Sequence, residues 1–299
     1  MMDQLDNYWR SHPLKQKTLR QPIWCRGVCL HSGLISEVQL MPADVDTGIV
    51  FHVIDKFNNV KTEIPATVDH TYSGMLRTVL KKDEVSLDTT EHLLAALSAL
   101  GINNLIIKVW GNEIPIFDGS AGNWTFLADC AGIVEQGHTV QQIKIIRTKT
   151  VKINNSWCSL APYDGYKLCY HMIYDHPMIG ERKFSIDLSR KSFDKELGTA
   201  RTFGFFKDID VIQAHGLAKG VSLSNTIVFN ESAIMGTSLQ WPDEPARHKV
   251  VDAIGDLSLA GAPILGKFYG FCSGHELNQT LVKAVLNDTS CWNWATIKH

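Results

Sequence analysis

His248 and Asp252 stand four residues apart, a spacing that a metal site can use. On an α-helix, residues i and i+4 lie one turn apart on the same face, and Asp256 extends that face by another turn. An imidazole and a carboxylate placed in this way supply half of a catalytic zinc site. The same spacing also describes a solvated or capping charge pair, so both interpretations stay open at this point.

Glu91 and His92 follow Thr89 and Thr90, where a helix is expected to begin. Adjacent side chains on a helix project about 100° apart, so His92 can bind a metal while Glu91 faces a water molecule as a general base. A glutamate in the first turn also simply favours the helix dipole. Glu91 and His92 are therefore a second candidate for part of a metal site, and the purely structural interpretation of this pair also stays open.

Two further segments carry side chains that catalysis uses. His275 directly follows Gly274 at an expected strand–helix junction, where catalytic groups are often exposed, although a lone histidine there is more often a cap or a surface residue. The segment Ala200–Phe205 combines a hydroxyl, a guanidinium and aromatic rings, which either line a ligand groove or begin a helix. The segment Glu113–Ser120 reads as a strand end and a tight turn at Asp118–Gly119.

The elements that must position these residues alternate between strands and helices, as in α+β or α/β proteins. Bulky or alternating residues predict strands at Ile49–Ile54, Asn104–Trp110 and Lys183–Leu188. Apolar periodicity predicts helices at Glu91–Leu100, Phe205–His215, Glu244–Leu259 and His275–Leu286. We expect Thr89 or Thr90 to cap the first helix and Gly101 to end it. The polar segment Val134–Gln142 predicts a domain boundary.

The composition excludes several classes of protein. The chain has 299 residues, long enough for two domains, and its 29 Lys and Arg nearly balance its 31 Asp and Glu. This balance argues against a dedicated nucleic-acid binder, which usually carries a basic excess. Polar residues interrupt the longest apolar stretch, Leu93–Trp110, so we expect no integral membrane segment.

The cysteines and the N-terminus predict a cytoplasmic protein. Seven scattered cysteines are typical of free thiols in a reducing compartment. Cys25 and Cys29 are spaced as half of a metal site, but no second pair follows them. Met1–Ser11 lacks the apolar segment of a secretory signal.

In combination and in this order, the motifs resemble those of the UDP-3-O-acyl-N-acetylglucosamine deacetylases, the zinc hydrolases of lipid A synthesis. The resemblance runs from about Leu19 to Leu286. The matching segments are Gly27–Gly33, Thr90–Leu93, Glu113–Ala121, Ala200–Phe205, Arg247–Leu257 and Ser273–His275.

The resemblance implies a role for each matching residue. It implies that the zinc ligands are His92, His248 and Asp252, which leaves an open position for water. Glu91 is the expected general base, and His275 the expected protonated group that assists the leaving amine. Asp256 is expected to orient His275, Thr202 to donate a hydrogen bond to the tetrahedral intermediate, and Lys249 to bind substrate. The expected lining of an acyl channel is Phe203, Ile209, Ala214, Leu217 and Ala218.

The resemblance also implies the fold, the reaction and the partners. The expected fold is α+β, a two-domain sandwich in which each domain is a β-sheet layered with helices and the active site lies at the interface. Residues 17–136 form the first expected domain and residues 137–299 the second, with an inserted β-α-β acyl-chain segment at about 202–224.

The expected reaction is zinc-dependent hydrolysis of the N-acetyl group of UDP-3-O-(3-hydroxyacyl)-N-acetylglucosamine, which releases acetate in the committed step of lipid A biosynthesis. One Zn²⁺ per chain is expected, or iron in the cell, and the protein is expected to be a cytoplasmic monomer. The alternative is a catalytically silent relative that binds acylated sugar nucleotides.

The sequence departs from the family pattern at three places. Met75–Leu76 is followed by Arg77, where the family often has a cysteine, and Gly220–Val221–Ser222 replaces a more usual Gly-Gly-Ser. The first 16 residues have no counterpart in the family pattern.

Overall fold

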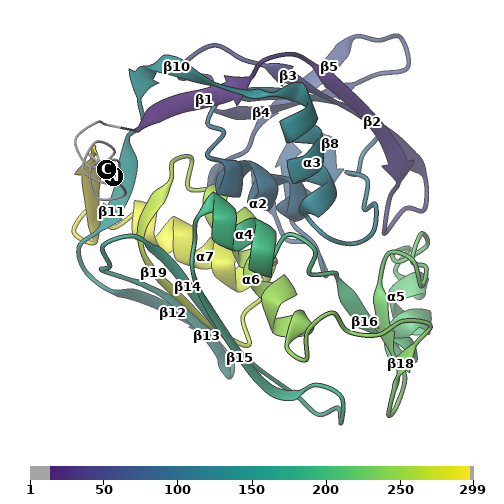
Figure 1. Ribbon diagram of the computed structural model, residues 1–299. Helices are drawn as coiled ribbons and strands as arrows, with labels where there is room; N and C mark the ends of the chain where they lie inside the picture. Colours follow the sequence, from purple (N-terminus) through teal and green to yellow (C-terminus); the bar gives the residue numbers. More distant parts are fainter. Residues whose placement is uncertain (1–13, 297–299) are drawn as a thin grey trace, which may run out of the picture.

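The computed structural model describes residues 14–296 and has an α+β fold in which two sheets enclose a central group of helices (Figure 1). The prediction made for Met1–Ser11 lies outside the described residues. Within them, no helix combines the length and the apolar character needed to cross a membrane.

The first layer is built around a five-stranded sheet (Figure 1). Its strands lie in the order β2 (Ile23–Val28), β3 (Ile35–Pro42), β9 (Leu105–Trp110), β4 (Ile49–Ile54) and β5 (Val60–Pro65). A smaller antiparallel sheet accompanies it and contains β6 (Thr71–Tyr72), β7 (Val79–Lys82) and β8 (Val85–Asp88). The helices of this layer are α2 (Glu91–Leu100) and α3 (Gly122–Ala131). A short 3₁₀ helix, Val68–His70, precedes β6.

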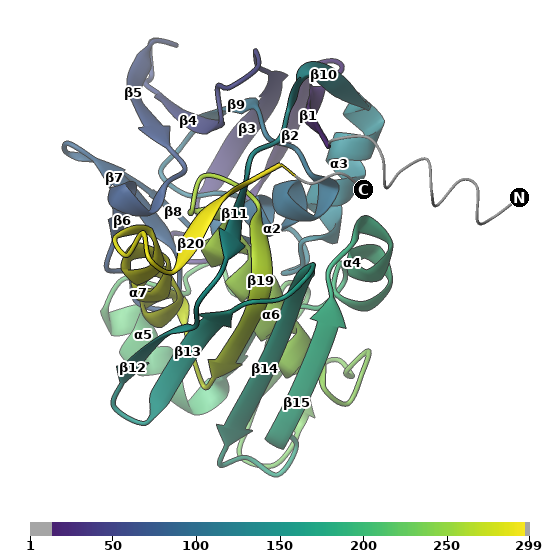
Figure 2. The same cartoon turned by 90° about the vertical axis from the view of Figure 1, so that its left-hand side faces the viewer.

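The second layer is a seven-stranded sheet, seen face-on in Figure 2. Its main path is β12 (Lys149–Ile153), β13 (Ser156–Ala161), β19 (Ile264–Phe271), β11 (Gln142–Ile145) and β20 (Trp292–Ala295). β14 (Tyr166–Tyr174) pairs with β19 and with β15 (Gly180–Asp187). The helices of this layer are α4 (Arg190–Glu196), α6 (Glu244–Ser258) and α7 (His275–Leu286).

A small β-α-β unit projects from the second layer (Figure 1). β16 (Phe203–Phe205) pairs in parallel with β17 (Ile227–Phe229), which pairs with β18 (Ile234–Met235). Parallel strands need a crossover connection, and here a 3₁₀ turn at Phe206–Asp208 and α5 (Ile209–Ala214) lie within it. The helix predicted at Phe205–His215 is therefore wrong at its start, because tertiary pairing makes Phe205 part of a strand.

The remaining predicted elements agree closely with the structure. The strands predicted at Ile49–Ile54 and Asn104–Trp110 are β4 and β9, and the alternating segment predicted at Lys183–Leu188 overlaps β15, which ends at Asp187. α6 and α7 match their predicted ranges within one residue. Pro245 lies in the first turn of α6, where its missing N–H costs nothing.

α2 confirms its predicted end but not its predicted cap. Gly101 ends the helix at φ 67°, in the left-handed region that glycine adopts readily. The Thr90 side chain makes no capping hydrogen bond, and the Thr89 hydroxyl donates to the buried Glu113 carboxylate instead. Thr90 has helical backbone angles (φ −85°, ψ −15°), whereas a capping residue typically has extended ones, so its hydroxyl does not cap the helix.

The connection between the two layers lies within the polar segment Val134–Gln142. β10 (Ile133–Thr139) is a strand that pairs with β1 (Lys15–Leu19) in the first layer. β11 begins at Gln142 in the second sheet, so Val140–Gln141 joins the layers.

Candidate active site

Two helices meet at the centre of the molecule and carry most of the site. α2 packs against α6 with nearly every residue buried on both helices. A Cβ atom on Gly255 would lie only 2.2 Å from the carbonyl oxygen of Glu91, so the two backbones approach as closely as glycine permits. This contact brings the first turn of α2 beside the C-terminal half of α6.

Three side chains from these helices form a group that could hold a metal ion. His92 comes from α2, and His248 and Asp252 lie one turn apart on α6. Asp252 Oδ1 lies 3.4 Å from His92 Nε2 and 3.3 Å from His248 Nε2. All three side chains are buried, and their ligand atoms lie within 4.8 Å of one another. His248 and Asp252 lie on one face of α6, as their spacing in the sequence predicted.

The hydrogen bonding of His248 fits this role. Its Nδ1 lies 3.0 Å from the carbonyl oxygen of Ala200, which can only accept, so Nδ1 carries the proton and Nε2 keeps its lone pair. Burial lowers the pKa of His248 to about 4, so the ring is neutral at pH 7. A neutral imidazole oriented through its second nitrogen is the usual form of a metal-binding histidine.

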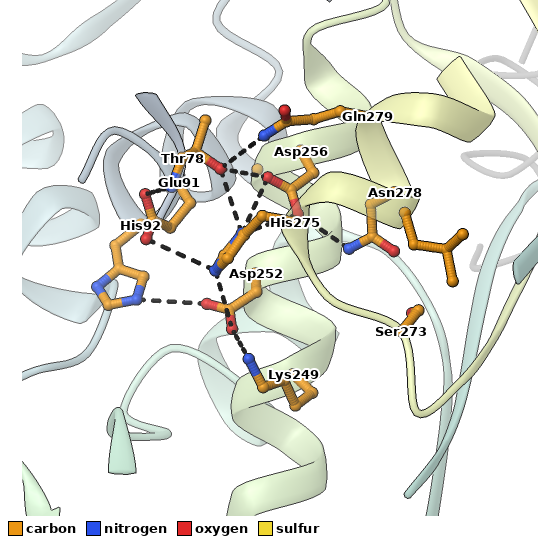
Figure 3. A network of polar contacts seen from close by, with 12 residues as sticks. Thr78, Glu91, His92, Lys249, Asp252, Asp256, Ser273, His275, Asn278 and Gln279 are labelled. Atoms are coloured by element: carbon orange, nitrogen blue, oxygen red, sulfur yellow. Dashed lines mark hydrogen bonds and ion pairs between the residues drawn. The ribbon is translucent and has the colours of Figure 1, made fainter. Parts of the chain in front are cut away.

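Glu91 and His275 face each other beside His92 and Asp252 (Figure 3). Glu91 Oε1 and Asp252 Oδ2 each lie 3.9 Å from His275 Nε2. Burial raises the pKa of Glu91 above its ordinary value. Burial disfavours a charged His275, but the carboxylates of Asp256, Glu91 and Asp252 outweigh burial and raise its pKa to about 9. The site therefore holds a carboxylate that binds a proton more readily than usual and an imidazole that stays protonated at neutral pH.

Asp256 orients His275 through its other ring nitrogen. Asp256 Oδ2 lies 3.0 Å from His275 Nδ1 and accepts from Asn278 Nδ2 at 2.9 Å. The Asp256 side chain is fully buried, so these donors replace water around the carboxylate.

Thr78 connects the two sides of the site and was not among the residues predicted from the sequence (Figure 3). Its backbone N–H donates to Glu91 Oε2 at 3.2 Å, and its hydroxyl donates to Asp256 Oδ1 at 2.5 Å. The Gln279 amide donates to the same hydroxyl at 3.2 Å. The only signal in the sequence was its place directly after Arg77, where the family pattern is interrupted. Arg77 itself pairs with Asp88 at 2.8 Å.

Lys249 lies between the three candidate ligand residues and Phe203. Its Nζ donates a hydrogen bond to Asp252 Oδ2 at 2.8 Å and lies 6.0 Å from the centroid of the Phe203 ring. Burial opposes its charge, but Asp252 outweighs burial and raises the pKa of Lys249, so the side chain stays charged.

A cavity of about 380 Å³ extends from the ligand group into the β-α-β unit. Glu91, His92, Thr202, His248, Lys249, Asp252 and His275 all line it. Of the residues expected to line an acyl channel, Phe203, Ile209 and Ala218 line the cavity, whereas Ala214 is exposed and Leu217 is buried elsewhere. Apolar residues that the sequence analysis did not name complete the wall, among them Ile212, Leu223, Val228 and Met235.

A second cavity, of about 500 Å³, lies on the other side of His275. Lys249 and His275 line both cavities, so the two spaces meet at the site. The second cavity has more polar walls, and Asn154, Ser156, Ser273 and Gly274 are among the residues that line it.

The cysteines take no part in this arrangement. All seven are free, and Cys25 and Cys29 each donate to a backbone carbonyl. Among the described residues, His92, His248 and Asp252 are the one group with metal-ligand geometry.

Comparison with known proteins identifies relatives that match nearly the whole chain. The sequence model of the family described as UDP-3-O-acyl N-acetylglycosamine deacetylase matches residues 16–287. A UDP-3-O-acyl-N-acetylglucosamine deacetylase of Brucella melitensis biotype 2 is 41% identical over 281 residues, 93% of this chain and 97% of that protein. The proteins of the same name from Brucella ovis and Brucella suis match with the same identity and coverage. The chain belongs to the UDP-3-O-acyl N-acetylglycosamine deacetylase family.

Proposed function

We propose that this protein hydrolyses the N-acetyl group of a UDP-3-O-(3-hydroxyacyl)-N-acetylglucosamine and releases acetate, the committed step of lipid A biosynthesis. The observation that carries the proposal is the meeting of Glu91 and His275 at 3.9 Å beside the group of His92, His248 and Asp252. Amide hydrolysis needs both a base for the attacking water and an acid for the leaving amine. The relatives are named as deacetylases of UDP-3-O-acyl-N-acetylglucosamine, which supports this reaction.

The three ligand residues suit zinc. Two imidazoles and one carboxylate are a common catalytic zinc set, and three protein ligands leave one position open. When bound, the metal lowers the pKa of a water molecule and polarises the substrate carbonyl. We propose one Zn²⁺ per chain; iron in the cell is the second candidate, since imidazole and carboxylate also suit Fe²⁺.

Glu91 is the proposed general base. Its carboxylate lies within the cavity next to His92, and burial raises its pKa, which makes it a better proton acceptor than an exposed glutamate. The Thr78 N–H fixes one of its oxygens, and the other oxygen faces His275. Glu91 therefore accepts the proton of the attacking water.

His275 is the proposed general acid. It is protonated at pH 7 because its pKa is raised to about 9, and Asp256 holds its Nδ1 so that Nε2 faces the cavity. From there, Nε2–H stabilises the charge that develops on the acetamide oxygen and donates its proton to the leaving amine. The Thr202 hydroxyl lines the same cavity and is proposed to donate a hydrogen bond to that oxygen.

The two cavities match the two ends of the proposed substrate. Phe203, Ile209 and Ala218, with their apolar neighbours, are suited to the acyl chain. The more polar cavity beyond Lys249 is suited to the nucleotide, and the Lys249 ammonium lies where a diphosphate would need a positive charge.

The division into domains belongs to the same proposal. We propose a first domain at residues 17–136, a second at 137–299, and an inserted acyl-chain segment that begins near Thr202. The pairing of β10 with β1 supports a boundary a few residues later, at Val140–Gln141. The parallel pairing of β16 with β17 supports an insertion that reaches Phe229 rather than residue 224.

We further propose a monomer in the cytoplasm. One chain supplies every residue of the site, and seven free cysteines are typical of a reducing compartment.

Glu91→Gln separates an enzyme from a silent binding protein. The enzyme should lose acetate release by about 100-fold or more, because general base catalysis contributes this much. It should retain its metal and its affinity for the acylated sugar nucleotide, because Gln keeps the shape of the side chain. Absence of acetate release by the unaltered, metal-loaded protein would support the silent relative instead.

A further inference from the structure

His31 lies in the loop between β2 and β3, and the proposed mechanism gives it no role. The side chain is 4% exposed and lines the same cavity as the metal ligands. Figure 1 shows that the end of β2 faces the β-α-β unit that contains α5. His31 therefore lies where the first layer meets the wall of the acyl passage.

Hydrogen bonds on two sides hold the His31 backbone in place. The N–H groups of His31 and Ser32 donate to the two oxygens of Glu113 at 2.7 and 2.8 Å. The His31 carbonyl accepts from Lys219 N at 3.0 Å, on the β-α-β unit. A Cβ atom on Gly220 would lie 2.1 Å from the carbonyl oxygen of Cys29, so this loop and the unit are in close backbone contact. The ring is thus attached to a rigid junction.

The environment of the ring determines which nitrogen carries the proton. His31 Nδ1 faces the backbone N–H of Ala218 at 3.4 Å, and because an N–H can only donate, Nδ1 must accept. Burial lowers the pKa of His31 to about 4, so the ring is neutral and its single proton is on Nε2. Nε2–H is a donor pointing into a buried space.

This donor has no partner among the described residues. Buried polar groups in folded proteins are nearly always hydrogen-bonded, so an unpaired one in a ligand cavity calls for a partner on the ligand. A neutral donor suits an uncharged acceptor oxygen, such as that of an ester, rather than the diphosphate.

The position of His31 indicates which substrate oxygen this is. On one side, Glu113 connects the His31 loop to Thr89, two residues before Glu91, where the acetamide reacts. On the other side, Ala218 belongs to the wall of the acyl passage. In the proposed substrate, the 3-O-acyl ester lies between these two parts, on the carbon next to the one that carries the acetamide.

We propose that His31 determines specificity for 3-O-acylated substrates, by donating a hydrogen bond from Nε2 to the carbonyl oxygen of the 3-O-acyl ester. This inference rests on the proposed function. It assigns to His31 a contact with the substrate but no part in the proton transfers of the reaction.

Two substitutions and two substrates test the proposal. His31→Asn keeps an acceptor near the position of Nδ1 for Ala218 but removes the donor, whereas His31→Gln can place an amide N–H near the position of Nε2. The substrates are the 3-O-acyl ester and the matching 3-O-alkyl ether, which has the same chain without the carbonyl. For each protein, kcat/KM is measured with both compounds, and the ratio of the two values is the readout.

In the unaltered protein, we expect the ester to be preferred over the ether by about tenfold or more, because the ether leaves a buried donor unpaired. In His31→Asn this ratio should fall towards one, mainly by loss of activity on the ester. His31→Gln should restore much of the ratio. Leu34→Ala, an exposed position on the same loop, should leave the ratio unchanged.

An ester-to-ether ratio that is the same in His31→Asn and in the unaltered protein would overturn the proposal, even if both rates fell together. A purely structural role would produce that parallel loss. Failure of the proposed function would look different, because the unaltered protein would then release no acetate from the ester.

Discussion

The close contact between α2 and α6 makes Gly255→Ala a sharp test of how the site is assembled. The added Cβ atom would lie 2.2 Å from the Glu91 carbonyl oxygen and 2.8 Å from its carbonyl carbon, whereas ordinary contacts begin near 3.4 Å. Neither atom belongs to a flexible side chain. The helices must therefore separate by about 1 Å, and this separation moves Glu91 and His92 away from Asp252.

The expected loss is larger for activity than for stability. Overpacking costs about 1–3 kcal/mol, and the better helix propensity of alanine offsets about 1 kcal/mol of that. We therefore expect the free energy of unfolding to fall by about 2 kcal/mol or less. A misplacement of about 1 Å at a catalytic site can cost about 100-fold in rate, so kcat/KM for acetate release should fall by that order.

The assay compares Gly255→Ala with Gly137→Ala, measuring acetate release, metal content and denaturant unfolding for both. Gly137 is a suitable control because a Cβ atom there would meet no atom within 4 Å. The control should match the unaltered protein in all three measurements. Unaltered kcat/KM and metal content in Gly255→Ala would refute the claim that this helix contact sets the geometry of the site.

Three further predictions concern individual side chains. Thr78→Val removes a hydroxyl that donates to the buried Asp256 carboxylate, so kcat should fall by about tenfold or more with little change in KM. Thr78→Ser keeps the hydroxyl and should retain activity. Equal kcat values for the two variants would contradict this role of Thr78. Because the folded-state pKa of His275 is raised from 6.5 to about 9, its stabilising contribution should be complete below pH 6.5 and lost as the pH rises through about 9. The difference in free energy of unfolding between the metal-free protein and its His275→Gln variant should therefore shrink over that range, and a constant difference would count against the protonated imidazole. Val228→Trp should narrow the apolar passage and lower kcat/KM for long acyl chains more than for short ones, which a series of chain lengths would reveal.

Local patterns predicted the part of the site that one helix carries. His248 and Asp252 lie on one face of α6 because their spacing matches the helical repeat. His92 belongs to the same group only because α2 packs on α6, and no local pattern contains that contact. The local Glu91–His92 pattern made His92 a candidate ligand, but only the resemblance to a family placed it in one site with His248 and Asp252.

The residues that sequence reasoning missed act through tertiary hydrogen bonds. Thr78 and Glu113 are ordinary residues near strands in the sequence, and their partners lie on elements that are distant along the chain. The helix predicted at Phe205 failed for a related reason, since its pairing with Phe229 overrides the local pattern. The bounds of α2 and α7 were predicted nearly to the residue. Apolar side chains are buried along one face of α7 and around almost all of α2, and this pattern is visible in the sequence.

The central claim is that one metal ion, held between α2 and α6, makes this protein a deacetylase. The most direct test is to titrate Zn²⁺ into the metal-free protein and to measure acetate release from the acylated UDP-sugar at each step. We expect activity to rise in proportion to bound metal and to saturate at one ion per chain, and to stay absent in Asp252→Ala. Acetate release by the metal-free protein, or none from the protein with one zinc ion per chain, would contradict the account.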